Sequence, residues 1–434
     1  MTEYRNLYAG LVDLNGIWRG KRVPGHQREK LEKDGFRMPL TACELDIWGH
    51  DYAGNPLIEK HGDGDGMCHP TGRGLLPITW QSQTAALLPV WMFREDGSMF
   101  PGDPRCALAA VLERFSAKGL TPVVALEVEF YLLDPTGDAI TPPGHLQRTM
   151  AGNVLSVDEI SDFEGFFADV EEAAEAQEIP ADATISELGP GQFEINLLHQ
   201  PDALRAADDA IFLKQIIKGV ARKHGHEASF MAKPMQEASG SGLHIHFSIL
   251  DESGANIFDN GGPEGTDALR HAVGGLTTTM ADATLIFAPH LNSYRRFEPG
   301  QHAPNSICWG YENRTVAVRI PGGPNAARRI EHRVAGADAN PYLMLAAVLA
   351  GALDGMENGT DPGEPLSGNA DYIELEQGPS HWREAIERFE QSAFIARAFA
   401  PELIHSMVGI KRQEMERFEA RMSLFETETY RSSV

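Results

Sequence analysis

Acidic side chains alternate with apolar ones in segments that otherwise have the composition of buried β-strands. The segment V-A-L-E-V-E-F places Glu127 and Glu129 among apolar neighbours. Successive side chains of a strand point to opposite faces, so the two glutamates share one face and the apolar residues share the other. Ionised carboxylates are seldom buried without a cation beside them. The fold must therefore combine a packed sheet face with a face that gathers acids.

Three further motifs repeat this mixture later in the chain. S-E-L-G-P-G-Q-F-E-I-N holds two glutamates across a turn, S-G-S-G-L-H-I-H aligns two histidines on one face, and R-R-I-E-H-R surrounds a glutamate with bases. Taken singly, these are equally typical of solvated faces or hydrogen-bonded core histidines. Together, five carboxylates and one imidazole suit Mg²⁺ or Mn²⁺ better than Zn²⁺. The predicted ligands of a two-metal cage are Glu127, Glu129, Glu187, Glu194, His244 and Glu331.

Arginines gather in the same part of the sequence. Seven lie between Arg295 and Arg333, in a chain whose formal net charge is −25. The planar guanidinium binds phosphate and carboxylate in a bidentate manner, although a salt-bridged surface is the alternative interpretation. Arg319 lies inside an apolar strand and needs a buried anion. An arginine cluster beside a metal cage predicts phosphoryl transfer from ATP. The chain has no P-loop pattern, because the most similar string, G-I-W-R-G-K-R at 16–22, does not match it.

Composition excludes several other functions. A net charge of −25 with a pI near 5.0 and no long basic stripe argues against nucleic acid as a partner. The four cysteines form no C-x-x-C pair, which argues against a structural zinc site or a disulfide framework. The longest apolar run, 342–353, is too short to span a bilayer, and the N-terminus has no apolar signal segment. We therefore expect a cytoplasmic protein with no membrane partner.

The pattern along the chain predicts a small sheet domain followed by a larger mixed domain. The first ~95 residues have strand-like runs (N-L-Y-A-G-L-V-D-L, P-L-T-A-C-E-L-D-I-W and T-A-A-L-L-P-V-W-M-F), and 60–74 is expected to be loop. Beyond them, hydrophobic periodicity predicts an α+β arrangement. The expected helices are 104–118, 157–177, 202–223, 263–283, 338–357 and 380–425. The expected strands are 122–133, a pair within 183–198, and 242–250, with strand and loop alternating over 285–335.

Seven strings in order carry a resemblance over essentially the whole chain. They are V-A-L-E-V-E-F, G-P-G-Q-F-E-I-N, G-S-G-L-H-I-H-F-S, N-S-Y-R-R-F-E-P-G, E-N-R-T-V-A-V-R-I-P, R-R-I-E-H-R and A-D-A-N-P-Y-L. The chain resembles the glutamine synthetase family. The resemblance implies a β-grasp-like domain over 1–97 and a catalytic domain over 98–434, with a curved antiparallel sheet flanked by helices. It also implies a homo-oligomer of stacked rings, a dodecamer, in which one subunit's N-terminal domain completes its neighbour's site.

The resemblance also implies roles for individual residues. One metal ion would be held by Glu129, Glu187 and Glu194, and the other by Glu127, His244 and Glu331. The residues implied at ATP are His246, Ser248, Arg314 and Arg319, and those implied at glutamate are Arg296, Arg333 and Gly240. Asp46 matches loosely the aspartate that reaches a neighbouring site. The implied reaction has two steps: the glutamate γ-carboxylate attacks the terminal phosphoryl group of ATP, and an amine then displaces phosphate.

Departures from the ammonia-using pattern concern the amine. The glutamate expected six residues after Arg296 is His302, a tyrosine of the ammonium pocket is absent from G-N-V-L-S at 152–156, and Ser239 replaces an asparagine. The strings F-M-A-K-P-M and W-G-Y-E-N-R-T-V resemble the branch that makes γ-glutamyl amides from putrescine, other polyamines or alkylamines. His302 would act as general base or only shape the pocket. The alternatives are an ammonia-dependent glutamine synthetase and a catalytically silent structural or regulatory relative, against which the intact ligand set argues.

Overall fold

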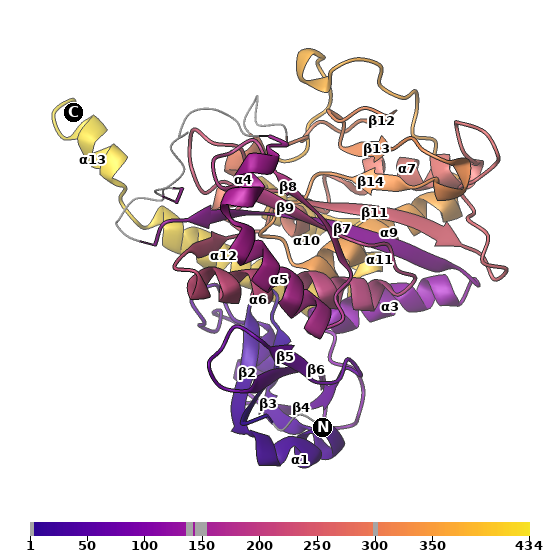
Figure 1. The fold of residues 1–434 in the computed structure, drawn as a ribbon. Helices are drawn as coiled ribbons and strands as arrows, with labels where there is room; N and C mark the ends of the chain where they lie inside the picture. The colour runs from indigo at the N-terminus through magenta and orange to yellow at the C-terminus, as the bar shows by residue number, and fades with distance from the viewer. Residues whose placement is uncertain (1–3, 136–141, 144–153, 298–302) are drawn as a thin grey trace.

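The structure is a computed structural model that describes residues 4–135, 142–143, 154–297 and 303–434. Two β-sheets and their helices make up the molecule, and the N-terminal sheet, indigo in Figure 1, lies below the larger one. The order of the first sheet is β2-β1-β6-β4-β3, with β5 on β6; β1 and β6 run parallel and the other pairs antiparallel. Its strands are β1 Asn6–Val12, β2 Trp18–Pro24, β3 Phe36–Pro39, β4 Asp65–Pro70, β5 Leu76–Ile78 and β6 Ala85–Phe93.

Two expectations for this first sheet were wrong. The segment 60–74, expected as loop, contains β4, in which Gly66 and Cys68 are buried between β3 and β6. The run expected as a strand around 39–48 instead continues from β3 into a 3₁₀ turn, Leu40–Cys43. The pairing partners of β4 are distant in sequence. A glycine- and aspartate-rich strand is stabilised here by its neighbours rather than by its own propensity.

The second sheet carries the acidic motifs, in the order β12-β13-β14-β11-β7-β9-β8, with β10 on β7. All its pairs are antiparallel except β12 with β13. Its strands are β7 Thr121–Leu133, β8 Ala181–Ser186, β9 Gln192–Leu197, β10 Glu227–Ser229, β11 Leu243–Leu250, β12 Trp309–Tyr311, β13 Val318–Ile320 and β14 Ile330–His332. Helices beneath it and a mixed, mostly antiparallel sheet confirm the predicted α+β class.

The helices pack against the apolar face of this sheet. The completely buried Leu126, Val128 and Phe130 belong to the same core cluster as residues of α6 and α9. The longer helices are α3 Pro104–Ser116, α5 Glu164–Ala176, α6 Ala203–Lys223, α7 Asp267–Thr279, α9 Pro341–Asn358, α10 Trp382–Gln391 and α12 Pro401–Glu419. The shorter ones are α1 Arg28–Asp34, α2 Pro56–Glu59, α4 Val157–Asp162, α8 Thr284–Phe287, α11 Ala393–Ala398 and α13 Leu424–Tyr430.

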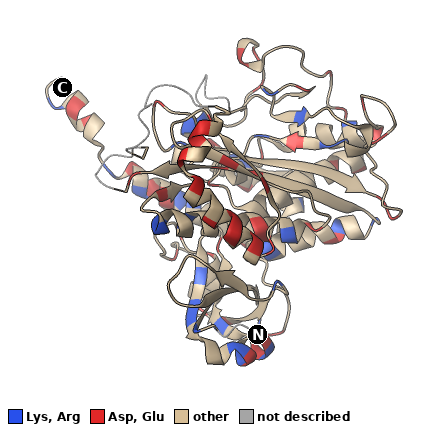
Figure 2. Ribbon diagram, viewed as in Figure 1, with Lys and Arg blue, Asp and Glu red and all other residues tan. Residues whose placement is uncertain are grey.

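Most predicted helices are confirmed, but two are interrupted. The segment 157–177 divides at Phe163 into α4 and α5, and Ser156 caps α4 by accepting a hydrogen bond from the Glu159 amide. The segment 380–425 divides at Ser392, which caps α11, and before Pro401, which begins α12. Figure 2 shows how the acidic charge gathers on the outer side of α5. No helix within the described ranges is both long and apolar enough to cross a bilayer.

A buried ion pair ties the C-terminal helices to the first sheet. Lys411 and Glu414 of α12 are both completely buried, and the Lys411 ammonium donates to Glu414 Oε2 at 2.9 Å. Lys411 also donates to the side chain of Asn15, which follows β1. Glu414 Oε1 accepts from the Ile47 amide at 2.8 Å and from Asn15 Nδ2 at 3.1 Å. Two opposite charges thus hold α12 against the N-terminal segment.

Removing one member of this pair leaves the other charged and buried. We expect Lys411→Met to lower the free energy of unfolding by about 3–5 kcal/mol, measured by urea denaturation with circular dichroism. Lys411→Met with Glu414→Met should recover much of the loss, because neither charge then remains. The neighbouring Arg412 forms a pair with Glu390 that is 43% and 40% exposed, so Arg412→Met should cost less than about 1 kcal/mol. Equal losses for Lys411→Met and Arg412→Met would contradict the prediction.

Candidate active site

Four neighbouring strands bring the acidic motifs to one face of the larger sheet. Glu129 of β7 lies opposite Glu194 of β9, and Glu127 lies opposite His244 of β11. On the other side of β11, His246 lies opposite Glu331 of β14. Since side chains directly opposite one another on paired strands point to the same face, the strand register places these residues in one row.

The row closes into two groups of possible metal ligands that share Glu127. His244 Nδ1 is 3.0 Å from Glu127 Oε2, and His246 Nε2 is 2.9 Å from Glu127 Oε1. In the part of the chain that the structure describes, one group consists of Glu127, His246 and Glu331 and the other of Glu127, Glu194 and His244; within each, the ligand atoms lie within 4.8 Å of one another. All of these residues belong to the sequence-predicted site. The structure thus brings His246, expected at the phosphates, as close to Glu127 as His244.

The carboxylates perturb one another strongly. Burial, with repulsion from Glu127 and Glu129, raises the pKa of Glu194 to about 10. Burial and the same two neighbours raise the pKa of Glu187, at the end of β8, to about 7. Burial also disfavours ionisation of Glu127, but hydrogen bonds from His244 and His246 outweigh it and hold the pKa of Glu127 far below its usual range. Such a cluster is stable in its fully ionised form only with added positive charge.

The donor set therefore fits divalent metal ions. It offers carboxylate oxygens and imidazole nitrogens from rigid strands, whereas the four cysteines are all buried elsewhere as free thiols. Oxygen-rich sets of this kind suit hard cations. Glu127, Glu129, Glu187, Glu194, His244, His246 and Glu331 are the residues that would hold them.

Protonation of Glu194 predicts a link between metal affinity and pH. A carboxyl whose pKa is about 10 carries a proton at pH 7, and a ligating carboxylate must lose it. We expect binding of Mg²⁺ at pH 7 to release about one proton per site. Raising the pH towards 10 removes that proton beforehand, so the apparent affinity should rise and the proton release should fall.

Titration calorimetry in two buffers of different ionisation enthalpy measures this release directly. Glu194→Gln carries no titratable proton at this position and is the control in which the buffer dependence should shrink. Identical binding heats in both buffers for the unchanged protein would contradict the expected proton release.

Arginines form a cationic border around Glu331. Arg319 of β13 lies opposite Glu331 and donates to its Oε2 at 2.8 Å, and Arg333 donates to the other oxygen. Burial alone would raise the pKa of Glu331, yet the Arg333 charge and the two histidines hold it below its usual value. The buried Nε atoms of Arg319 and Arg333 have no hydrogen-bond partner among the described residues. Each guanidinium therefore retains a donor for an anionic ligand.

Arg296 approaches the same region from the segment 291–297. It is 4% exposed, donates to the Val334 carbonyl at 2.7 Å, and its side chain packs against the loop at Gly240 and Gly242. A Cβ atom at Gly242 would lie 2.8 Å from Arg296 Nη2 and 2.9 Å from His244 Nε2. A side chain larger than glycine at this position would therefore require the predicted glutamate clamp and the predicted metal ligand to shift.

The remaining predicted site residues lie farther from the row of acids and histidines, or outside the residues that the structure describes. Ser248 is half-buried on β11, two positions beyond His246, and Arg314 is exposed between β12 and β13. Asp46 is buried in its own turn, where it accepts from the Trp48 and His50 amides and from Gln413 of α12. His302 lies outside the described residues, as do 152–153 of the G-N-V-L-S stretch.

Sequence reasoning missed several residues in contact with the site. Arg329 donates to His246 Nδ1 at 3.2 Å, and His199 lies with its ring 6.2 Å from that of His246. Burial, aided by the charges of His246 and Arg329, lowers the pKa of His199 to about 4. Gln192 donates to Glu129, and Tyr131 donates to the carbonyl of Ser239 in the neighbouring loop. Gln192 shares a strand face with Glu194, two residues on, which is the signal that could have identified it.

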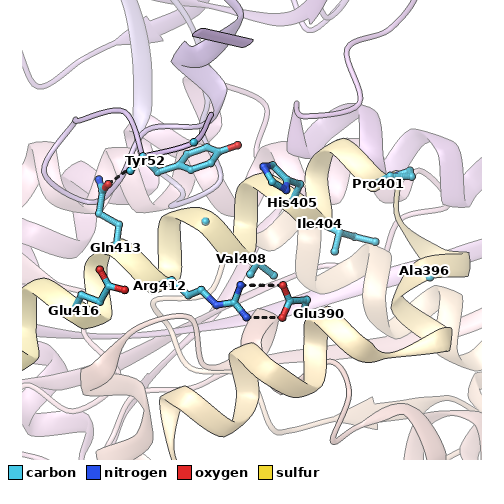
Figure 3. Close-up of a pocket in the computed structure, with 13 residues that line it drawn as sticks. Tyr52, Glu390, Ala396, Pro401, Ile404, His405, Val408, Arg412, Gln413 and Glu416 are labelled. Carbon is cyan, nitrogen blue, oxygen red and sulfur yellow. Dashed lines mark hydrogen bonds and ion pairs between the residues drawn. The ribbon is translucent and has the colours of Figure 1, made fainter. Parts of the chain in front are cut away.

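A separate cavity of about 570 Å³ lies on the other side of the helical layer, where a loop of the first sheet meets α10, α11 and α12. Figure 3 shows Tyr52 and Gln413 at one end, Ile404 and Pro401 at the other, and the Arg412–Glu390 pair along the wall. The two terminal nitrogens of Arg412, Nη1 and Nη2, each donate to one carboxylate oxygen of Glu390. Arg412 and Glu390 neutralise one another, Glu416 adds a second carboxylate to the lining, and none of the predicted site residues that the structure describes lines this cavity.

Comparisons with known proteins agree with this geometry. Residues 101–430 match the profile of the glutamine synthetase catalytic domain. The chain is 38% identical over 433 residues to gamma-glutamylputrescine synthetase PuuA of Escherichia coli K12, covering 98% of this chain and 91% of that one. It is 33% identical to the glutamate–isopropylamine ligase of a Pseudomonas species, covering 97% and 94%. A solved structure of GmaS without ligand superposes with a TM-score of 0.87 at 29% identity, covering 99% and 97%.

Proposed function

This chain belongs to the glutamine synthetase family, and we propose that it is an ATP-dependent ligase that joins the γ-carboxylate of glutamate to an organic amine. The observation that carries the proposal is the row of carboxylates and imidazoles on β7, β9, β11 and β14, bordered by buried arginines. Two similar proteins are named for putrescine and isopropylamine as their amines, which supports an organic amine here. We assign the catalysis to residues 98–434.

In this proposal the arginines bind and orient the two anionic substrates. The buried Nε of Arg319 and that of Arg333 have no hydrogen-bond partner among the residues that the structure describes, and Arg319 would bind the phosphates while Arg333 joins Arg296 at the glutamate. His246, Ser248 and Arg314 would complete the ATP site, and the backbone of Gly240 would line the glutamate site. Preorganised donors of this kind act where charge spreads over a transferring phosphoryl group.

The acidic row would hold two or more Mg²⁺ or Mn²⁺ ions per site. When bound, they supply the positive charge that a triphosphate needs as its terminal group is transferred. Glu129, Glu187 and Glu194 would serve one ion, and Glu127, His244 and Glu331 the other. Strand pairing fixes the backbone of every one of these residues except Glu187, which follows β8, so the chain itself would contribute the alignment of glutamate's γ-carboxylate with the terminal phosphate.

The second candidate is an ammonia-dependent glutamine synthetase, and the two are separated by the choice of amine. We expect kcat/KM for putrescine or isopropylamine to exceed that for ammonia by at least about tenfold, because one methylene group in an apolar pocket is already worth about tenfold or more. Phosphate release with a fixed concentration of glutamate and ATP measures this. A clear preference for ammonia would establish the second candidate instead, and absence of turnover with every amine would favour a silent relative.

His302 remains our proposed general base for the amine, on the sequence departure alone. An unperturbed imidazole has a pKa near 6.5, so it accepts a proton from the attacking amine less well as the pH falls. Replacement by alanine should therefore lower turnover most above about pH 6.5, where the imidazole is neutral and can accept a proton, and least at lower pH, where it is already protonated. An unchanged pH profile would leave His302 only the role of shaping the pocket.

Assembly into stacked rings, with Asp46 serving a neighbouring subunit, is also a proposal from the family. Two features support it. The C-terminal helix α13 projects from the body (Figure 1), and Met422, Leu424 and Phe425 in or beside it are 74–79% exposed. Apolar side chains exposed to this degree are typical of surfaces that a partner covers. Light scattering of the full chain measures the number of subunits.

A further inference from the structure

Three consecutive backbone carbonyls beside the acidic row are held by three buried side chains. Lys233 donates to the Ala238 carbonyl, the Tyr131 hydroxyl donates to the Ser239 carbonyl at 2.6 Å, and Gln192 Nε2 donates to the Gly240 carbonyl at 3.0 Å. The three side chains are at most 4% exposed and come from different parts of the chain. The loop that they hold, 238–242, therefore has a fixed backbone. We refer to it as the glycine loop.

Gln192 joins the glycine loop to a predicted metal ligand. Its Oε1 accepts from the Gly189 amide at 2.9 Å, which fixes the orientation of its side-chain amide. Its Nε2 then faces both the Gly240 carbonyl and Glu129 Oε2, at 3.0 Å and 3.3 Å. The same oxygen of Glu129 accepts from the Gly242 amide at 2.7 Å. Oε2 of Glu129 is thereby committed to the loop, and Oε1, 3.9 Å from His244 Nε2, is left for a metal ion.

Tyr131 completes this connection from the neighbouring strand. It lies directly opposite Gln192 in the sheet, is completely buried, and its hydroxyl is 3.1 Å from Gln192 Oε1. A Cβ atom at Gly189 would lie 1.9 Å from that hydroxyl, so the turn that carries Glu187 also closes over Tyr131. On its other side the glycine loop touches Arg296. The loop thus lies between the group that would ligate metal and the group that would bind glutamate.

We propose that Tyr131 and Gln192 are positioning residues that hold the glycine loop against Glu129, so that metal binding and glutamate binding strengthen each other. The inference rests on the proposed function, since it takes glutamate as the ligand beside Arg296. Its physical basis is that one Glu129 oxygen orders the loop while the other serves the metal ion. Any ion that fixes the Glu129 carboxylate therefore also fixes the loop, and linkage makes the effect reciprocal.

Tyr131→Phe removes one hydroxyl and little else. We expect the KM for glutamate to rise about threefold to tenfold, the usual effect of one lost hydrogen bond, with kcat changed less than about twofold. The matched control is Tyr342→Phe, because Tyr342 is also a buried tyrosine and its hydroxyl donates to Asp208, away from the row. It should lower thermal stability to a similar degree and leave the KM for glutamate unchanged. Equal KM values in the two variants would overturn the role of Tyr131.

Gln192→Met tests the coupling itself, with a side chain of similar size and no amide. Calorimetry with ADP present measures the Kd of glutamate at low and at saturating Mg²⁺. In the unchanged protein we expect saturating Mg²⁺ to tighten glutamate binding by about fivefold or more. In Gln192→Met the gain should fall towards unity, although glutamate still binds. A gain as large as in the unchanged protein would overturn the proposal.

The same titration separates this inference from the proposed function. If the unchanged protein, with ADP and saturating Mg²⁺, binds no glutamate, the proposed ligase activity fails and the coupling fails with it. If it binds glutamate and both variants bind equally well with the same Mg²⁺ dependence, only the positioning role fails. Circular dichroism of each variant establishes that the fold is retained.

Discussion

Glu127→Gln should lower kcat/KM for amide formation by at least about a thousandfold. Glu127 is the member common to both ligand groups, with one carboxylate oxygen towards His244 and the other towards His246. Glutamine keeps the shape but removes the charge, and its NH₂ group replaces one acceptor by a donor. Both ion positions are then weakened at once, so a higher Mg²⁺ concentration should restore only part of the activity. Phosphate release over a series of Mg²⁺ concentrations is the measurement.

The control for this substitution is a buried glutamate elsewhere. Glu44 is 1% exposed, and burial raises its pKa to about 7, so Glu44→Gln makes the same chemical change in a comparable environment. It should retain near-normal kcat. If Glu127→Gln kept more than about a tenth of the activity at ordinary Mg²⁺, the two-metal interpretation of the row would be wrong.

Arg319→Gln should lower kcat by about a thousandfold with a smaller effect on the KM for ATP, as for other arginines that stabilise a transferring phosphoryl group. One guanidinium nitrogen donates to Glu331, and the buried Nε has no hydrogen-bond partner in the part of the chain that the structure describes. Glutamine retains a hydrogen-bond donor but no charge, and the charge is what should matter most in the transition state.

Arg328→Gln provides the comparison. Arg328 is as buried as Arg319, but its guanidinium donates to the Gly262 carbonyl and to Asn325, away from Glu331. We expect this variant to lose stability and to retain most of its kcat. A kcat for Arg319→Gln within about tenfold of the unchanged protein would contradict a role at the phosphates.

The sequence predicted the parts of the fold that have a strong period. Glu127 and Glu129 alternate with residues of the core. The strands predicted at 122–133 and 242–250 are β7 and β11 in the structure. The helix predicted over 338–357, which contains the apolar run from 342, is α9 in the structure. By contrast, β4 was missed because its residues 65–70 have low strand propensity, and only its pairing with Phe36–Pro39 and with β6 makes it a strand.

The site was predictable in its membership more than in its geometry. Strand parity predicted that Glu127 and Glu129 share one face and that the two histidines share one face, since parity depends on sequence spacing alone. Which atoms approach one another depends on the pairing register of β7, β9, β11 and β14. That register involves residues far apart in sequence, so local sequence patterns do not predict it. Gln192 shows the limit most clearly: its contacts with Glu129 and Gly240 involve residues 63 and 48 positions away. The division of ligands between two ions, and the role of His302, stay predictions.

The pairing of β11 with β7 determines more than the position of two histidines. If β11 slipped by one residue, Leu243, Ile245 and Phe247 would turn towards Glu127 and the imidazoles would turn into the apolar layer. A chain in that arrangement would lose its core contacts and its chemistry together. A molecule with this mispairing would therefore lack a stable core, so the register of β11 couples folding to the placement of the imidazoles.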